Sequence, residues 1–287
     1  MSQHLAAPPA WGWFIVLYFF FGGIAGGAYT LGTMLRLWGE PRDEDAARLA
    51  FVISFLVLLV CPVLLTLDLG RPLRFWHMMV DSRTMALTFK YWSPMSVGAW
   101  ALAIFGVFAT GSFLAARRPD GPVGRLLRGP FGRLFTIAGS GLGLFVAGYT
   151  GVLLSVSNEA VWSDTWTLGG LFLASALSAS AAAIMLVTIR RQGRGQAVVS
   201  VAKLSEADRY FIILELVLLV VFFLTLGAVA AQVLVGGWAL LWLLVLAGTV
   251  GPLALHLRRS SPLLAPSLEL LGNLAQRTVD VFSAQAR

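Results

Sequence analysis

The chain alternates long apolar stretches with short polar connections. Seven stretches are almost free of charge, at roughly 12–37, 48–67, 91–115, 133–156, 166–189, 209–232 and 237–256. Each reaches the length of about 20 residues that an α-helix needs to cross the hydrocarbon core of a bilayer. The pattern therefore predicts seven membrane-spanning helices.

An eighth stretch, at roughly 262–283, is more polar and carries Glu269, Asn273, Arg277 and Asp280. This pattern is compatible with an eighth spanning helix or with an amphipathic helix that lies at the membrane interface. We expect the spanning form, which would place both ends of the chain on one side of the membrane.

Two segments resemble each other in the placing of small residues. FFFGGIAGGA (19–28) and LFLASALSAS (171–180) are offset by 152 positions. Small residues let helix backbones approach closely in lipid, so packing alone accounts for them. The sequence therefore predicts an all-α integral membrane protein with eight transmembrane helices. Residues 1–287 would form a single membrane domain of two four-helix bundles, 12–156 and 166–283.

Composition agrees with a membrane protein. Hydrophobic residues make up 58% of the chain and charged residues 12%, about half the charged share of soluble domains. The single cysteine, Cys61, excludes a disulfide framework and a thiolate-held metal cluster within this chain. We expect no removable signal peptide, because the opening MSQHLAAPPA has no basic region.

The three histidines restrict the metal chemistry. His4 lies in the N-terminal tail, His77 in a connection, and His256 at the end of the seventh stretch, so the expected topology separates His77 from His256. A b-type haem usually takes two histidines from facing helices. We therefore expect no haem and no zinc or other metal site in this chain, and the sequence holds no phosphate-binding or dinucleotide motif.

The basic residues indicate an orientation. The connections after the first, third, fifth and seventh stretches, with their flanks, hold 15 of the 21 lysines and arginines. By the positive-inside rule these connections face the cytoplasm, and both termini face outward. The net charge of +7 is therefore a signal of topology and does not indicate a nucleic-acid partner.

The connection after the second stretch is unusually rich in ionisable groups. It reads LLTLDLGRPLRFWHMMVD (64–81) and faces outward in this topology. Asp68 and Arg71 are spaced to form an ion pair across a tight turn, a structural role that would fix the loop. Arg74, His77 and the later Lys90 alternate with aromatic residues. Such a segment suits a polar headgroup entering from lipid, an acidic partner protein, or simple anchoring to phospholipid.

A few polar side chains lie within or next to the spans. Tyr149 sits towards the outer end of the fourth stretch, and its hydroxyl requires a hydrogen-bond partner, either a ligand or a backbone carbonyl. Glu215 lies inside the sixth stretch, where a carboxylate is costly and marks a functional candidate. Asn158 and Glu159 follow the fourth stretch on the same side as His77.

Four segments resemble the NrfD/PsrC family, the membrane subunits of polysulfide reductase-like respiratory complexes. They read WGWFIVLYFFFGGIAGGAY, LDLGRPLRFWHMM, WSPMSVGAW and GYTGVLLSVSNEAVWSD, and they extend from about Trp11 to Ala182. The resemblance implies an eight-helical, haem-free subunit that binds quinone or menaquinone in a bacterial or archaeal cytoplasmic membrane. It also implies an iron–sulfur partner of the four-cluster ferredoxin type and, beyond it, a molybdopterin catalytic subunit.

Within this interpretation the polar residues receive roles in quinone chemistry. Tyr149 would bond one quinone carbonyl, and His77 would bond the other or exchange protons, because its unperturbed pKa lies near neutrality. The expected proton carriers are Asp68, Glu159 and Glu215. The cations Arg71, Arg74 and Lys90 would favour a negatively charged intermediate or an acidic partner. The remaining residues would complete the quinone site, and they are Trp11, Trp13, Trp76 and Asn158.

A non-redox function is the alternative. A membrane anchor, or a transporter-like bundle whose repeat surrounds a solute path, would also fit Glu215 and the small-residue segments. Against a transporter, neither the first nor the fifth stretch is interrupted by proline.

The orientation can be tested with fusions. We expect a reporter that is active only outside the cytoplasm to be active when fused near Ser82 or Asp164, and inactive near Pro119 or Gly195, because basic residues concentrate in the latter connections. The reverse pattern would overturn the orientation.

Overall fold

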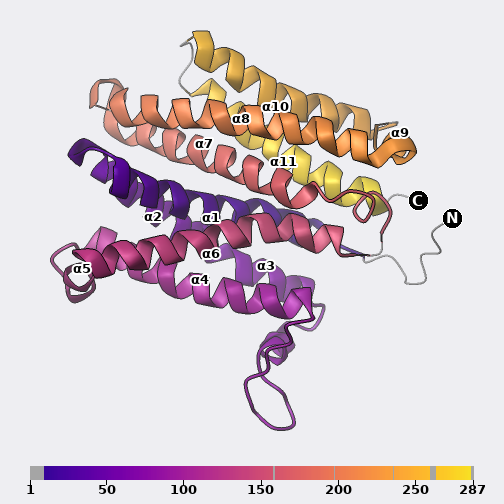
Figure 1. Cartoon of the computed structure of the whole chain (residues 1–287), viewed down its shortest axis with the longest axis horizontal. Coiled ribbons are helices and arrows are strands. Elements are labelled where there is room, and N and C mark those ends of the chain that lie inside the picture. The colour runs from indigo at the N-terminus through magenta and orange to yellow at the C-terminus, as the bar shows by residue number, and fades with distance from the viewer. Residues whose placement is uncertain (1–9, 158, 197, 235, 259–262, 286–287) are drawn as a thin grey trace.

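The protein is a bundle of long helices that run back and forth side by side (Figure 1). The computed structural model describes residues 10–157, 159–196, 198–234, 236–258 and 263–285. The α-helices are α1 (Trp13–Trp38), α2 (Glu44–Leu58), α3 (Val60–Asp68), α4 (Pro94–Arg117), α5 (Pro122–Leu126), α6 (Pro130–Ser155), α7 (Leu168–Gln196), α8 (Val198–Leu226), α9 (Ala230–Leu234), α10 (Trp238–Arg258) and α11 (Leu264–Gln285). The 3₁₀ helices are η1 (Pro41–Asp43), η2 (Pro72–Met78) and η3 (Gly227–Val229).

The predicted all-α membrane fold is confirmed. Seven helices are long and apolar enough to cross a membrane, and they correspond to the seven apolar stretches. Several boundaries differ from the expectation, and α7 continues to Gln196 rather than ending near 189. The second span consists of α2 and α3, which meet at Leu59, and the sixth begins at Val198 rather than near 209. The two bundles, 12–156 and 166–283, stay a prediction.

The polar eighth stretch forms α11, which packs against α1, α7 and α10. Its polar side chains point into the protein, and Glu269, Arg277 and Asp280 are each 1% exposed. The Asn273 amide donates to the carbonyl of Ser175 on α7 at 2.8 Å. A helix whose polar side chains are buried against its neighbours does not have the exposed polar face of an interfacial helix, so this packing favours the spanning form.

Helix α1 lies at the centre and touches its neighbours backbone to backbone. A methyl group at Gly26 would lie 2.1 Å from the carbonyl oxygen of Gly143 on α6. On the side facing α7, a methyl group at Gly27 would lie 2.3 Å from the Ser180 hydroxyl. That hydroxyl contacts the carbonyl oxygen of Ile24 at 3.1 Å. The two similar small-residue segments therefore pack against each other across the α1–α7 interface.

The two described ends of the chain meet at one end of the bundle, which we call the N-terminal side. The Trp11 amide donates to the side chain of Gln285 at 2.8 Å, and the Gln285 amide donates back to the Trp11 carbonyl at 3.1 Å. The Trp11 ring stacks on Trp162, whose indole N–H donates to the Asp280 carbonyl at 2.7 Å. These contacts join α1, the turn after α6, and α11.

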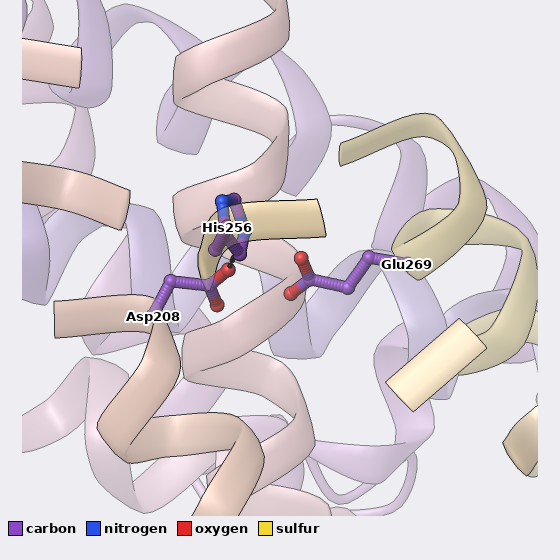
Figure 2. Close-up of side chains that lie close together, drawn as sticks. All are labelled: Asp208, His256 and Glu269. Carbon is purple, nitrogen blue, oxygen red and sulfur yellow. Dashed lines mark hydrogen bonds and ion pairs between the residues drawn. The ribbon is translucent and has the colours of Figure 1, made fainter. Parts of the chain in front are cut away.

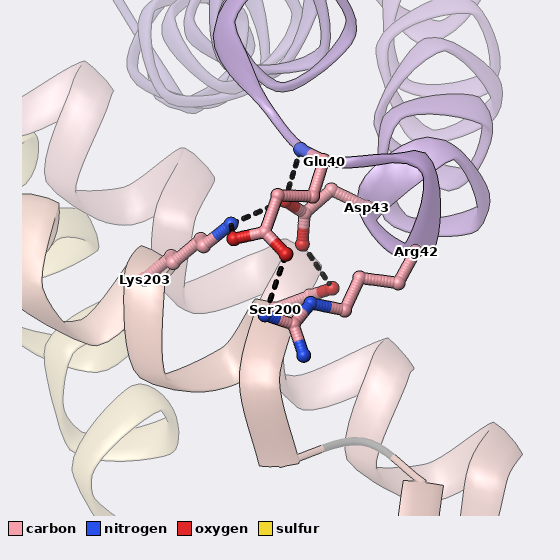
Figure 3. A network of polar contacts seen from close by, with 5 residues as sticks. All are labelled: Glu40, Arg42, Asp43, Ser200 and Lys203. Atoms are coloured by element: carbon pink, nitrogen blue, oxygen red, sulfur yellow. Dashed lines mark hydrogen bonds and ion pairs between the residues drawn. The ribbon is translucent and has the colours of Figure 1, made fainter.

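An ionic cluster joins η1 to α8 at the opposite side of the bundle (Figure 3). The Lys203 ammonium contacts Asp43 at 2.6 Å and Glu40 at 3.0 Å, and the Ser200 hydroxyl donates to Asp43 at 2.8 Å. The Asp43 side chain is fully buried. The hydrogen bond that Lys203 donates to Glu40 lowers the pKa of the Glu40 carboxyl. This cluster explains why α8 begins before its apolar stretch, since the polar first turns are held by η1.

The close packing of α1 can be tested by adding one methyl group. We expect Gly26→Ala to destabilise the protein by about 1–3 kcal/mol, because the helices must separate to admit the methyl group. Gly141→Ala on α6 is the matched control, since its methyl group would meet nothing within 4 Å. Thermal unfolding in detergent is the measurement, and equal midpoints for both variants would contradict the packing.

Candidate functional site

An apolar groove with a volume of about 740 Å³ lies between α1, α2, α3, α4 and α6. Its walls include Phe55 and Leu58 on α2 and Leu102, Val107 and Leu114 on α4. Leu59 and Val107 are 51% and 66% exposed, so the groove opens on the outer surface of the bundle. Because these helices cross the membrane, that surface faces lipid.

Polar groups gather at the end of the groove on the N-terminal side. Trp11, Tyr18, Asp68 and Tyr149 line it there. The two threonines of the lining, Thr66 and Thr110, donate to carbonyls of their own helices at 2.6 and 2.7 Å. The groove is therefore apolar over most of its length and polar at one end, where two phenols, an indole and a carboxyl group line it.

Tyr149 is held by contacts with α4. Its hydroxyl donates to the carbonyl oxygen of Pro94, and its ring stacks on Phe145. The Tyr149 ring fits here because residue 98 is glycine, since a methyl group at Gly98 would lie 2.5 Å from the ring. The sequence left a ligand or a backbone carbonyl as the partner of this hydroxyl, and the structure shows the backbone carbonyl. The phenolic oxygen can still accept a hydrogen bond, since a hydroxyl has two acceptor lone pairs.

The segment η2 covers the mouth of the groove at the N-terminal side. Phe75 and Met78 of η2 and the adjacent Met79 line the groove, whereas Arg74 of η2 and the preceding Arg71 are exposed. The expected ion pair between Asp68 and Arg71 is absent from the described residues. Asp68 ends α3 and lines the groove, and Gly70 then reverses the chain with a φ of +62°, which is a conformation that suits glycine.

His77 lies on the exposed side of η2 and does not line the groove. Its ring stacks on Trp76 with centroids 3.8 Å apart, and Nδ1 lies 3.1 Å from the carbonyl oxygen of Arg74. Trp76 is likewise outside the lining. The exposed Lys90 lies beyond a short connection in which the Asp81 carboxylate accepts the amides of Arg83 and Thr84. These backbone bonds lower the pKa of Asp81.

The remaining predicted site residues that the structure describes lie away from the groove. Trp13 is 58% exposed and packs edge-on against Phe282. Glu159 is buried in the turn after α6, where its carbonyl oxygen accepts from the Ser163 hydroxyl at 2.9 Å. Asn158 lies outside the described residues. Glu215 is buried in α8, and its nearby charged groups are Arg277, Asp208 and Asp280. The structure thus brings together only Trp11, Asp68 and Tyr149 of the predicted set.

Tyr18 is a groove residue that the sequence analysis missed. It is 4% exposed, and it lies seven residues after Trp11, which is about two helical turns. That spacing, together with a hydroxyl in an otherwise apolar run, was the available signal.

Comparisons with known proteins show which family this sequence is similar to. The family model described as "Polysulphide reductase, NrfD" matches residues 2–286. The sequence is 28% identical over 259 residues to a polysulfide reductase chain from Wolinella succinogenes, an alignment that covers 83% of this chain and 79% of that protein. It is 29% identical over 104 residues to a selenate reductase subunit from Mesobacillus selenatarsenatis. The latter alignment covers 36% of this chain and only 22% of that relative.

Proposed function

The chain belongs to the polysulphide reductase NrfD family, and we propose that it is the haem-free subunit through which a respiratory oxidoreductase complex reacts with membrane quinone. The observation that carries the proposal is the lipid-facing groove that ends at Asp68, Tyr149, Tyr18 and Trp11. In a quinol, likewise, a polar ring ends a long apolar tail. The tail would lie between α2 and α4, and the ring would lie at the polar end.

The dimensions of the groove suit such a ligand. Small-molecule sites have volumes of roughly 300–1,000 Å³ and combine apolar walls with a few polar groups. At about 740 Å³ the groove lies within this range. Its exposed residues, such as Val107 and Leu114, would let a lipid-soluble molecule enter sideways without crossing water. A transporter-like bundle would instead need a path through the bundle interior.

Two of the polar groups at the groove end, Tyr149 and Asp68, would have different tasks. The proton of Tyr149 is engaged by Pro94, so its oxygen would accept a hydrogen bond from a quinol O–H. The Asp68 carboxylate would accept the second O–H and then its proton. Oxidation breaks both O–H bonds and transfers two electrons to a partner, and both protons would leave through Asp68 one after the other, because the Tyr149 oxygen accepts a hydrogen bond but not a proton. The reverse sequence would reduce quinone.

His77 and the exposed cations would act around the groove. His77 lies on the same short segment as Phe75, which lines the groove, so it could pass protons between Asp68 and water. Arg71, Arg74 and Lys90 are exposed beside large apolar residues such as Leu73 and Trp92. We assign this surface to the electron-accepting or electron-donating partner. Glu159 and Glu215, away from the groove, would carry protons only in further steps.

The names of the relatives support a multi-subunit assembly. One is a component chain of a polysulfide reductase, and the other is a subunit of a selenate reductase. By analogy this protein would associate with an iron–sulfur subunit of the four-cluster ferredoxin type and, through it, with a molybdopterin catalytic subunit. We place the complex in a bacterial or archaeal cytoplasmic membrane. The polar end of the groove and both termini would face outward, because the basic connections lie at the opposite side.

Tyr149→Phe tests the binding contact. Removing the hydroxyl should cost about 0.5–1.5 kcal/mol of quinol binding, which is about a two- to tenfold rise in KM where KM reflects binding. Tyr210→Phe is the matched control, because Tyr210 is 66% exposed on α8 and lies outside the groove. The measurement is oxidation of a quinol analogue by the assembled complex. Equal KM values for the two variants would remove Tyr149 from the site.

Asp68→Asn tests the proton acceptor. The amide cannot take a proton, so we expect kcat to fall by about 10²-fold or more and to lose most of its pH dependence. Asp164→Asn is the control, because Asp164 lies on the same side outside the groove and binds the Val161 amide through an oxygen that asparagine keeps. An unchanged rate and pH profile for Asp68→Asn would contradict its role.

A further inference from the structure

Three ligand-bearing side chains from three helices meet inside the second half of the protein (Figure 2). Asp208 comes from α8, His256 from α10 and Glu269 from α11. One nitrogen or oxygen atom from each lies within 4.8 Å of the others. Asp208 is fully buried, Glu269 is 1% exposed, and the His256 side chain is 9% exposed.

The hydrogen bonds around these side chains satisfy both oxygens of Asp208 but leave one oxygen of Glu269 without a donor. The Ser178 hydroxyl contacts Asp208 at 3.0 Å and also contacts Glu269. A hydroxyl has a single proton, so it can donate to only one of them at a time. The other oxygen of Glu269 is buried and faces no hydrogen-bond donor among the described residues, and its carboxylate faces Asp208 and His256.

No lysine or arginine ion pair neutralises this cluster in the described part of the chain. The His256 imidazole contacts Asp208 at 3.0 Å. The buried Arg277 has Asp280 and Glu215 as its charged neighbours instead. Two carboxylates that face each other away from water need either a bound cation or a proton between them, because isolated buried charge is very costly.

We propose that Asp208, His256 and Glu269 bind a divalent metal ion of the zinc type. Two carboxylates and a neutral imidazole compensate a 2+ charge, and three protein ligands with one open position are a common zinc arrangement. The imidazole ligand disfavours magnesium and calcium, which take oxygen ligands. The Ser178 oxygen lies beside the carboxylates and is available for the fourth position.

The imidazole is already oriented for this role. Its Nδ1 lies 2.9 Å from the Ser205 hydroxyl, which leaves Nε2 directed at Asp208. Metal-binding histidines almost always hold their second ring nitrogen in a hydrogen bond of this kind, which fixes the tautomer and the ring. A bound ion would join α8, α10 and α11, and this function is independent of the quinone groove.

The ion can be measured directly on the full-length chain in detergent. In a His4→Ala, His77→Ala background, His256 is the last of the three histidines. After chelator washing and zinc titration, we expect one tightly bound zinc per chain by elemental analysis. X-ray absorption at the zinc edge should show one imidazole among oxygen ligands. No retained zinc, or zinc without an imidazole ligand, would overturn the proposal and leave a shared proton between the carboxylates.

Variants separate this site from adventitious binding. Glu269→Gln should raise the zinc Kd by more than about tenfold, since it removes a ligand charge. Asp280→Asn makes the corresponding change to a buried carboxyl outside the cluster, whose charged neighbour is Arg277, and should leave the Kd unchanged. Equal affinities for Glu269→Gln and the parent would place the ion elsewhere and refute the assignment. If Glu269→Gln does not fold, the X-ray absorption result on the parent still decides.

Discussion

The close approach of α1 to its neighbours is the constraint on which the rest of the structure depends. At Gly26 and Gly143 the backbones of α1 and α6 touch with no side chain between them, and at Gly27 a serine hydroxyl of α7 takes the place of a side chain. In lipid, where apolar surface gains little from association, such packing supplies much of the attraction between helices. Helix α1 can therefore contact both halves of the chain at once.

This packing also determines where space remains. Because α1 lies tightly against α6 and α7, the less crowded side of α1 faces α3 and α4, and the groove lies there. A glycine also permits close packing at the candidate site, because the absence of a side chain at Gly98 lets the Tyr149 ring lie against α4. The second half of the chain contrasts with this arrangement. There the polar side chains of α11 point inward and form hydrogen bonds to α7. These buried polar residues account for the low hydropathy of α11.

Much of the fold could be predicted from the sequence, because a spanning helix requires a long apolar run whatever its partners are. Within the site, Trp11, Asp68 and Tyr149 were found as polar or amphipathic residues at the ends of such runs. The prediction of an Asp68–Arg71 ion pair was wrong, because Gly70 turns the chain so that Asp68 lines the groove and Arg71 is exposed. The groove itself could not be predicted, since it depends on how closely helices distant in sequence approach one another. The cluster at Asp208 was missed for a related reason. A search for histidine pairs does not consider two carboxylates that packing brings beside a single imidazole.

Photoaffinity labelling tests the quinone-binding groove most directly. An azido-quinone would be photolysed with the assembled complex in membranes, and the labelled peptides identified by mass spectrometry. We expect labels on the groove-lining parts of α1, α3 and α4, including the peptides that carry Tyr18, Asp68 and Met95, and loss of those labels when excess unlabelled quinone is present. Competable labels confined to α8, α10 and α11 would contradict the assignment of the groove as the quinone site.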